Sequence, residues 1–394
     1  MSQNPTAQER MMKVQEVLMR AVNRELSWLQ AADILGCSPR SLRRWRRRFE
    51  KYGTAGLVDG RTRGHRSPRW VKPVDLEPLL KLYRTRYAGF NVRHFCSIAR
   101  RDHGLQWSYS FVRQALQGAG LVKKRRPRGR HYLRRPPRAC FGEMLHLDGS
   151  HHPWLTLRPD TRQCLIAVVD DATRQILYAQ LSERETTEAV MAALCAVFTH
   201  HGLPQSLYTD RASWAACTRS SEGKPRLDRP TQVQRALHRL GVEHILAYSP
   251  QARGRGERVN RTLQGRLVNE LRVASIRTIE RANRYLNDTF LPHYNIELTR
   301  SPTDSISAFV TAGGADLEQI LCHEELRTVG KDNTVAIGGI RLQIAKQPGR
   351  PTCAGLELTV RRHLDGTHSV WRGLNCWGRF DGKGRPRTAS EQAA

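Results

Sequence analysis

The sequence predicts a multidomain protein of α plus α/β class, with helical modules first, a mixed α/β domain in the middle and a β-rich part last. Three observations support this prediction. Basic helical patterns fill the first third of the 394 residues, strands and helices alternate from Glu143, and apolar residues alternate with Gly and Pro turns from Thr334. A chain of this length accommodates about two to four domains.

The positive charge is concentrated near the N-terminus. The formal net charge is +29, and most of the excess of Lys and Arg precedes Cys140. A strongly basic arm beside a nearly balanced domain is typical of proteins that bind nucleic acid. The alternative is a merely basic surface, but the excess gathers in two places rather than spreading evenly.

Composition also argues against several other classes of protein. The chain contains no apolar run of about 18 residues or more, and its first residues, MSQNPTAQERMMK, lack the apolar core of a signal peptide. We therefore expect no membrane partner and an intracellular location. The nine cysteines are scattered and never spaced as C-x-x-C, which disfavours a disulfide framework and a Cys-based zinc site.

Residues 1–60 are predicted to form a helix-turn-helix DNA-binding domain. Gly36 breaks a first helix, Ser38 is a candidate N-cap, and Pro39 begins a second helix that runs to Tyr52. So many arginines on the second helix favour DNA binding over a simple packing role. The candidate DNA-binding residues there are Arg40, Arg43, Arg44 and Arg47.

Residues 75–122 are predicted to form a second helix-turn-helix-like domain, although a plain helical spacer has a similar pattern. Residues 123–140 then form a basic linker, whose stretch KKRRPRGRHYLRRPPR contains no acid. Such a segment is suited to follow a phosphate backbone, whether or not it is ordered alone. Its candidate DNA-binding residues are Lys123, Lys124, Arg125, Arg126, Arg128 and Arg130.

Residues 141–310 are predicted to form a mixed-sheet catalytic core. Buried-strand patterns cover Met144–Leu147, Cys164–Val169 and Ser206–Tyr208, and helical patterns cover Thr187–His200 and a segment from about Gly256. A sheet built from antiparallel strands followed by alternating helices and strands belongs to the mixed α/β class.

Three acids stand at the edges of these elements. Asp148 and Asp210 each follow a predicted strand, and Glu257 lies in the first turn of a helix after a glycine-rich turn. Converging carboxylates require a counter-charge and suit Mg²⁺ or Mn²⁺, with two ions about 4 Å apart for a phosphodiester displacement. A single acid at a strand end is more often a solvated cap. Asp170 and Asp171 are rival acids, which we expect to be structural.

Other polar and aromatic residues near the acids have alternative interpretations. Glu257, Arg261 and Gln264 share one helix face, so Arg261 and Gln264 are candidate DNA-binding residues, the alternative being an ordinary surface pair. The remaining candidates are His146, His151 and His152, which line a groove or bind zinc, and Trp154 and Trp214, which stack on a displaced base or pack in the core.

The C-terminal part is predicted to be β-rich. A small β-barrel is expected over residues 330–380, after a short helix at Thr303–Phe309, and the tail from Gly382 is expected to be disordered. Its candidate DNA-facing side chains, for which a purely packing role is the alternative, are Arg361, Arg362, Trp371 and Arg372.

Three motifs resemble the DDE transposase and retroviral-integrase superfamily, most closely bacterial insertion-sequence transposases of the ISNCY type. They are HLDGS at 146–150, LYTDRASW at 207–214 and SPQARGRGERVNRTLQGRL at 249–267. The resemblance implies an RNase H-like, integrase-type core in which Asp148, Asp210 and Glu257 are the catalytic, metal-binding residues. The gap between the last two acids exceeds that of retroviral integrases, with the extra residues in the polar stretch Thr218 to Pro230.

The resemblance implies a DNA transposase that binds the terminal repeats of its mobile element and catalyses metal-dependent 3′-end cleavage and strand transfer. Its partners would be double-stranded DNA, both transposon ends and target, and further copies of itself, at least a dimer. The resemblance also implies a bacterial cytoplasmic, nucleoid-associated location. Two alternatives remain. One is a non-catalytic DNA-binding regulator derived from a transposase, and the other is a structure-specific nuclease with the same core.

Overall fold

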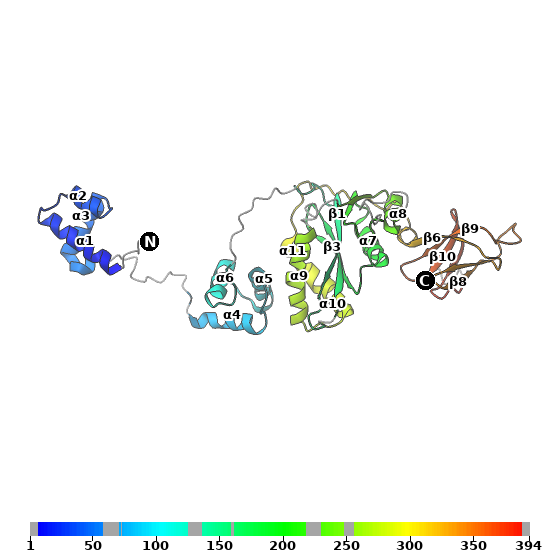
Figure 1. Cartoon of the computed structure of the whole chain (residues 1–394), viewed down its shortest axis with the longest axis horizontal. Coiled ribbons are helices and arrows are strands. Elements are labelled where there is room, and N and C mark those ends of the chain that lie inside the picture. Colours follow the sequence, from blue (N-terminus) through cyan, green and yellow to red (C-terminus); the bar gives the residue numbers. More distant parts are fainter. Residues whose placement is uncertain are drawn as a thin grey trace. The chain divides into compact units, whose positions relative to one another are not determined.

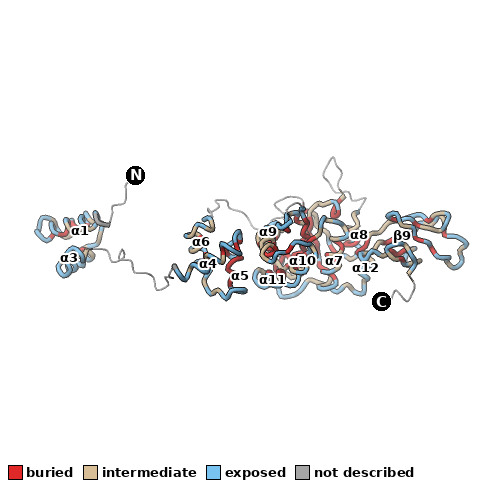
Figure 2. Tube along the Cα trace, turned by 90° about the horizontal axis from the view of Figure 1, so that it is seen from below, coloured by how far each residue is buried: buried red, intermediate tan, exposed pale blue. Residues whose placement is uncertain are grey.

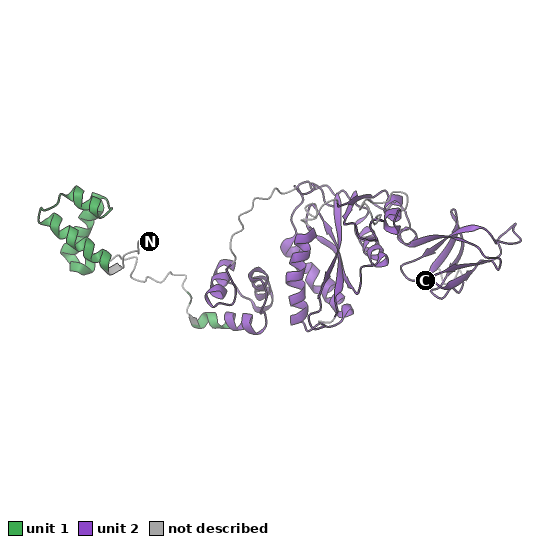
Figure 3. Cartoon of the chain, in the orientation of Figure 1, with its two compact units in different colours: residues 1–78 green, residues 79–394 purple. Residues whose placement is uncertain are grey.

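The computed structural model describes residues 7–57, 71, 73–124, 136–158, 161–217, 230–247 and 256–387. The chain divides into two compact units, Met1–Pro78 and Leu79–Ala394 (Figure 3). Each unit is described by itself. Four of the predicted linker residues, Arg125, Arg126, Arg128 and Arg130, lie outside the described residues.

The first unit contains a helical domain around a small apolar core. Its helices are α1 (Ala7–Val22), α2 (Trp28–Ile34) and α3 (Pro39–Tyr52), followed by a short 3-10 helix, η1 (Gly53–Gly56). The Ser38 side chain accepts a hydrogen bond from the Ser41 backbone and Pro39 occupies the first turn, so α3 begins where the sequence predicts. Helix α1 was not predicted.

Three helices form a second helical module. They are α4 (Pro73–Thr85), α5 (Val92–His103) and α6 (Tyr109–Gly118). Aromatic rings fill its core, with Tyr83 packed edge-on against Phe95 at a centroid distance of 5.0 Å. Asn91 and Ser108 cap the last two helices. The helices expected within residues 75–122 are therefore present.

The central domain is built on a five-stranded mixed sheet, as predicted (Figure 1). The strand order is β3-β2-β1-β4-β5, with β1 antiparallel to β2, β2 antiparallel to β3, β1 parallel to β4, and β4 parallel to β5. The strands are β1 (Met144–His152), β2 (Gln163–Asp170), β3 (Ile176–Ser182), β4 (Ser206–Thr209) and β5 (Glu243–Leu246).

Helices cover both faces of this sheet, and the alternation of side chains along β2 shows why. Ile166 and Val168 belong to the apolar core shared with α7 (Thr187–His201) and α8 (Gln232–Arg239). Leu165, Ala167 and Val169 belong to a second core on the opposite face. The buried residues gather between the layers (Figure 2). The second face is covered by α9 (Gly256–Val273), α10 (Ile279–Tyr285), a π-helical turn η3 (Leu286–Phe290) and α11 (Leu291–Leu298).

The short helix predicted at Thr303–Phe309 is not present. Residues 303–306 form bends, Ser307 forms a bridge with Phe141, and the Phe309 ring lies directly against Gly142. The backbone pairing at the start of the core replaces the helical hydrogen bonds that the pattern suggested.

The C-terminal strands do not close into the predicted barrel. They form a four-stranded antiparallel sheet of order β11-β10-β9-β6 and a separate β7–β8 hairpin around one apolar core. The sheet stays open because, within the described residues, the hairpin strands pair only with each other. The elements are α12 (Leu317–Ile320), β6 (His323–Thr328), β7 (Thr334–Ile337), β8 (Ile340–Gln343), β9 (Glu357–Arg362), β10 (His368–Arg372) and β11 (Asn375–Phe380).

The segment after Gly382 is only partly consistent with the expected disorder. Residues up to 387 are described, and Pro386 forms a bridge with Phe380, while the last seven residues lie outside the described part. Within the described residues, no helix is long and apolar enough to cross a membrane.

Candidate active site

The sequence predicted that Asp148 lies at the end of a strand. In the structure it lies in the middle of β1. Strand β2 pairs with β1 as far as His152, so the strand continues through polar residues. Successive side chains on a strand point to opposite faces. Asp148 and Ser150 therefore face α9, while Gly149 and His151 face the side of α7.

Asp148 and Asp210 are related by the register of neighbouring strands. The parallel register between β1 and β4 pairs Met144 with Ser206 and His146 with Tyr208, an offset of 62 residues. The same offset separates Asp148 from Asp210, which directly follows β4. The printed pairing ends at His146 and Tyr208; continued by two residues, it would set Asp210 beside Asp148. Asp210 itself lies past the strand, where its Oδ1 accepts a hydrogen bond from the Ala212 backbone at 2.9 Å.

The first turns of α9 lie against Asp148. A Cβ atom at Gly256 would stand 3.8 Å from Asp148 Oδ2. Asn260 donates a hydrogen bond to the same oxygen at 2.7 Å, and Gln264 donates one to Ser150 Oγ at 3.0 Å. The helix therefore holds the Asp148 carboxylate through one turn and the strand through the next.

The two other predicted residues of α9 are exposed. Glu257 is adjacent to Gly256 in the sequence, so its exposed side chain starts from the helix end that lies beside Asp148. Arg261 is exposed one turn later. Of the predicted set on this helix, Gln264 is turned toward the sheet by its bond to Ser150.

A third acid near this edge was missed by sequence reasoning. The carboxylate of Glu185 lies over Gly149, where a Cβ atom would stand 2.6 Å from Glu185 Oε2. Its other oxygen accepts a hydrogen bond from Trp214 Nε1 at 2.7 Å. Glu185 thus connects the strand that carries Asp148 with the segment that follows Asp210. Gly149 lies beyond the predicted strand Met144–Leu147, so no local pattern indicated this contact.

The three histidines around Asp148 do not converge. His146 is bonded to Asp171 at 2.7 Å, and the His152 ring packs edge-on against Trp154. His151 lies near Cys164 and Glu185, with ligand atoms within 4.8 Å of one another. Burial, together with nearby carboxylates, raises the pKa of the Cys164 thiol to about 12, so the thiol is protonated at neutral pH.

Asp170 and Asp171 have the structural role that the sequence suggested. Asp170 is fully buried and accepts hydrogen bonds from the Gly142 and Thr173 backbone and from the Thr173 hydroxyl. Burial raises its pKa in spite of these bonds. Asp171 accepts hydrogen bonds from His146 and from the Arg138 backbone. Both carboxylates therefore fasten loops to the sheet.

The two tryptophans are core residues rather than exposed stacking platforms. Trp154 is fully buried, and its indole nitrogen donates a hydrogen bond to the Ser150 carbonyl at 2.9 Å. Trp214 is 5% exposed and belongs to the core on the α7 face. The packing interpretation of both residues is therefore the one that fits.

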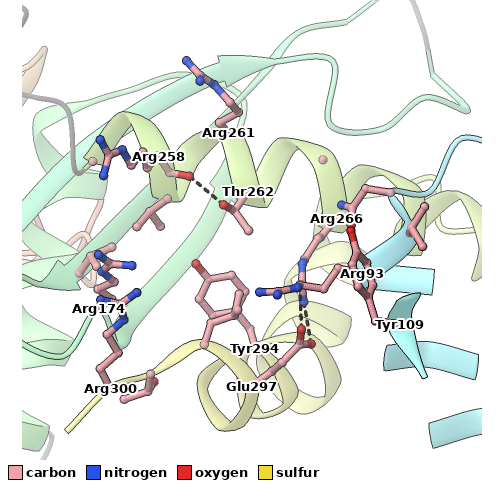
Figure 4. A pocket seen from close by; sticks show the side chains of 18 of the residues that line it. Arg93, Tyr109, Arg174, Arg258, Arg261, Thr262, Arg266, Tyr294, Glu297 and Arg300 are labelled. Carbon is pink, nitrogen blue, oxygen red and sulfur yellow. Dashed lines mark hydrogen bonds and ion pairs between the residues drawn. The ribbon is translucent and has the colours of Figure 1, made fainter. Parts of the chain in front are cut away.

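A cleft of about 1140 Å³ lies between the second helical module and the α9 face of the central domain (Figure 4). Nine Lys and Arg side chains and three carboxylates line it. Among its cations are three predicted DNA-binding residues, Lys123, Lys124 and Arg261. Gly256 lines the cleft as well, so the cleft reaches the position of Asp148.

The arginines of α3 are exposed as expected. Arg40, Arg43, Arg44 and Arg47 all lie on the surface of the first unit. Within the same helix, Arg46 is bonded to Glu50 and lies 5.4 Å from the centroid of the Trp28 ring.

The predicted DNA-facing side of the C-terminal part is only partly available. Arg361 is buried, bonded to Glu324 at 2.8 Å and stacked on Trp371 at 4.6 Å. Arg362 forms an ion pair with Glu188 of the central domain. Arg372 lies over Trp377 at 5.5 Å. Arg361 therefore stabilises the β-rich part from within, and Arg362 links it to the central domain.

The chain has identifiable relatives. A family model described as a helix-turn-helix domain matches residues 15–65. "Putative transposase y4bF" of Sinorhizobium fredii is 29% identical over 365 residues, which are 91% of this chain and 78% of that protein. The transposase for insertion sequence IS1202 of Streptococcus pneumoniae is 30% identical over 288 residues, which are 64% of this chain.

The chain resembles transposases. This confirms the resemblance predicted from the three motifs, and the predicted N-terminal helix-turn-helix is confirmed as well. The alignment spans 61% of the IS1202 protein, so the chain covers less than two thirds of that relative.

Solved structures of retroviral integrases also match the chain. A simian T-cell lymphotropic virus intasome, in complex with PP2A regulatory subunit B56 gamma, is 16% identical with a TM-score of 0.33 and covers 78% of this chain and 99% of its own. The HTLV-2 integrase catalytic core domain in complex with magnesium, in its trimeric form, is 16% identical with a TM-score of 0.28. That match covers 38% of this chain and 88% of the integrase chain.

Proposed function

We propose that this protein is a DDE-type polynucleotidyl transferase that binds the terminal repeats of its own mobile element. It cleaves the element at its 3′ ends and joins the ends to target DNA. The observation that supports this proposal most is the parallel register of β1 on β4, which, continued by two residues, would set Asp148 beside Asp210 where α9 begins. The transposase relatives and the helix-turn-helix domain agree with it.

The donor atoms of these residues suit a divalent metal, although the three carboxylates do not all lie within 4.8 Å of one another in this structure. Asp148, Asp210 and Glu257 would supply hard carboxylate oxygens, which suit Mg²⁺ or Mn²⁺, and two ions are proposed. When bound, such ions make the attacking oxygen more nucleophilic and stabilise the charge of the leaving oxygen. The Asn260 bond to Asp148 Oδ2 orients one carboxylate, in the way that supporting hydrogen bonds orient metal ligands.

The reaction consists of two in-line displacements at phosphorus. In the first, water attacks and the bond to the 3′ oxygen breaks, leaving a 3′-hydroxyl and a 5′-phosphate. In the second, that 3′-hydroxyl attacks a phosphodiester of the target, and the bond from this phosphorus to the target's 3′ oxygen breaks, which leaves a 3′-hydroxyl on the target strand. The protein holds the two strands and excludes other orientations, and it forms no covalent bond with DNA.

Two basic surfaces would hold the DNA during these steps. The exposed arginines of α3 are placed to contact one DNA segment, and the cations of the cleft are placed to contact another. Because each neutralised phosphate releases counterions, affinity should fall steeply between about 50 and 200 mM salt. Pairing of two element ends requires at least two copies of the chain. This activity places the protein with DNA in the bacterial cytoplasm.

The test uses labelled DNA from the borders of the protein's own gene, with Mg²⁺, Mn²⁺ or a chelator. We compare wild type with Asp148→Asn, which keeps the oxygen that accepts the Asn260 bond but removes the charge. Asp288→Asn, at an exposed acid of η3, is the matched control. Metal-dependent nicking at the repeat end by wild type and the control, but not by Asp148→Asn, is the expected result.

Two other outcomes reject the proposal. Specific binding without cleavage under any metal favours the transposase-derived regulator. Nicking that follows DNA structure rather than the border sequence favours the nuclease.

A further inference from the structure

A histidine, a cysteine and a glutamate converge on the α7 face of the central sheet. The ligand atoms of His151, Cys164 and Glu185 all lie within 4.8 Å of one another. Within the described part of the chain, no other group of three His, Cys, Asp or Glu side chains brings its ligand atoms this close. Because Asp148 faces α9, on the other side of the sheet, this cluster is separate from the candidate active site.

The pairing of β1 with β2 brings two of the three side chains together. His151 lies directly opposite Cys164 in the antiparallel register. Side chains of directly opposite residues share a face of the sheet and lie close enough to interact. Cys164 is fully buried in the core shared with α7, whereas His151 is exposed. The thiol therefore lies at the inner end of the cluster and the imidazole at its solvent side.

The third side chain is held in position from two directions. Trp214 Nε1 donates a hydrogen bond to Glu185 Oε1 at 2.7 Å, and Glu185 Oε2 lies 3.5 Å from His151 Nε2. Gly149 leaves the space that this carboxylate occupies, since a Cβ atom there would stand 2.6 Å from Oε2. Hydrogen bonds of the kind that Trp214 donates orient the ligands of metal sites. Glu185 is thus fixed with one oxygen toward the other two ligand atoms.

The spacing suits a tetrahedral ion better than a simple ion pair. Nitrogen and oxygen ligands about 2.1 Å from tetrahedral zinc stand about 3.4 Å apart, close to the 3.5 Å between His151 and Glu185. A hydrogen-bonded pair of these groups would be closer, at about 2.8 Å. Thiolate and imidazole ligands favour Zn²⁺ over Mg²⁺. Three protein ligands leave a fourth position for water, on the side of the exposed His151.

We propose that His151, Cys164 and Glu185 bind Zn²⁺. The ion joins β1, β2 and the connection from β3 to α7, and it fixes the part of β1 that follows Asp148. As the bond from zinc to sulfur forms, the S–H bond of Cys164 breaks and the proton passes to solvent. The site goes beyond the proposed function and does not depend on it, because it uses none of the acids assigned to the reaction.

Binding is tested on the reduced full chain, stripped of metal, by competition with a chromophoric chelator for Zn²⁺. Wild type should bind one ion per chain, and excess Mg²⁺ should not displace it. His151→Ala and Glu185→Gln, which keeps an acceptor for Trp214, should each weaken binding at least about tenfold. His238→Ala, at an exposed histidine of α8, is the matched control and should bind like wild type. Asp148→Asn should also bind like wild type, which separates this site from the acids of the proposed active site.

Substitution of Co²⁺ for Zn²⁺ reports on the cysteine ligand directly, because a thiolate on Co²⁺ gives a charge-transfer absorption band. The band should appear in wild type and in Cys322→Ser, at another fully buried cysteine, but not in Cys164→Ser. Zinc should also raise the urea midpoint of wild type and not that of His151→Ala. If Cys164→Ser does not fold, loss of the band in His151→Ala, at an exposed residue, supports the site.

Two results would overturn the zinc site. One is binding of Zn²⁺ by wild type that is no tighter than binding by His151→Ala, and the other is a Co²⁺ complex without the thiolate band. Either result leaves the catalytic proposal standing, since nicking is measured separately with Mg²⁺ or Mn²⁺.

Discussion

The charged residues of α9 are buried and paired in the second half of the helix and exposed in the first half. In the second half, Arg266 and Glu270 are buried, and each is matched by a partner on another element. In the first half, Glu257 and Arg261 remain exposed beside the acids of the sheet. Charges that are matched inside the protein stabilise the fold, whereas charges kept at an open edge remain available for a ligand.

The largest effect is expected on the rate of nicking, from a substitution in the first half of α9. Glu257→Gln should reduce metal-dependent nicking more than about 100-fold, which is the upper range for residues that merely support a metal ligand. Since the side chain is exposed, the free energy of unfolding should change by less than about 0.5 kcal/mol. Nicking rates and urea unfolding of the same preparation check both parts. An active Glu257→Gln enzyme would remove the distinction between the two halves.

A substitution in the second half of α9 should lower the free energy of unfolding. Glu270→Ala removes the acceptor of hydrogen bonds from His94 and Tyr285, both at 2.7 Å. Hydrogen bonds to charged groups contribute about 1.5–3 kcal/mol each, so we expect a loss of about 3 kcal/mol in the free energy of unfolding. Chemical denaturation measures this loss. Wild-type stability would show that this network is not needed to hold α5 on the core.

A smaller effect on the nicking rate is expected from a substitution at Asn260, in the first half of α9. Asn260→Ala removes the donor to Asp148 Oδ2 and should lower the nicking rate about 10- to 100-fold, with the requirement for metal shifted to higher concentration. Asn269→Ala is the matched control, because Asn269 donates only within its own helix, to the Gly265 carbonyl. Equal effects of the two variants would contradict a role for Asn260 at the carboxylate.

The smallest effect is a pH dependence of the stability that the bond between His94 and Glu270 contributes. Burial lowers the pKa of His94 from its ordinary 6.5, so His94 is neutral and its Nε2–H donates to Glu270. Burial alone would raise the pKa of Glu270, but hydrogen bonds from His94 and Tyr285 outweigh burial and keep it low. The stability linked to His94 is therefore complete above pH 6.5 and is lost as pH falls toward the lowered pKa of the folded state.

This loss amounts to at most about 1.4 kcal/mol per pH unit. Urea midpoints between pH 7.5 and 5.5 should fall more for wild type than for His94→Gln, which can still donate to Glu270. Parallel curves for the two proteins would assign the pH dependence to other groups, such as the half-buried His244, whose pKa desolvation lowers to about 4.

The sequence predicted much of the fold because caps and apolar runs are local signals. Ser38 and Pro39 located the start of α3, and the run around Ile166 located β2. Asp148 was assigned to a strand end because GSHH is polar, whereas pairing with β2 extends the strand. Two features depend on residues far apart in the chain, which no local pattern contains. They are the open arrangement of the C-terminal strands and the contact of Glu185 with Gly149.

The register of β1 on β4 limits where the chain tolerates changes in length. The connection between the two strands contains β2, β3 and α7, and residues inserted in its loops leave the register of β1 on β4 unchanged. A single residue inserted between Ser206 and Asp210 would turn the second carboxylate to the opposite face of the sheet. Single-residue insertions should therefore be tolerated in these loops and should abolish nicking within the five positions from Ser206 to Asp210.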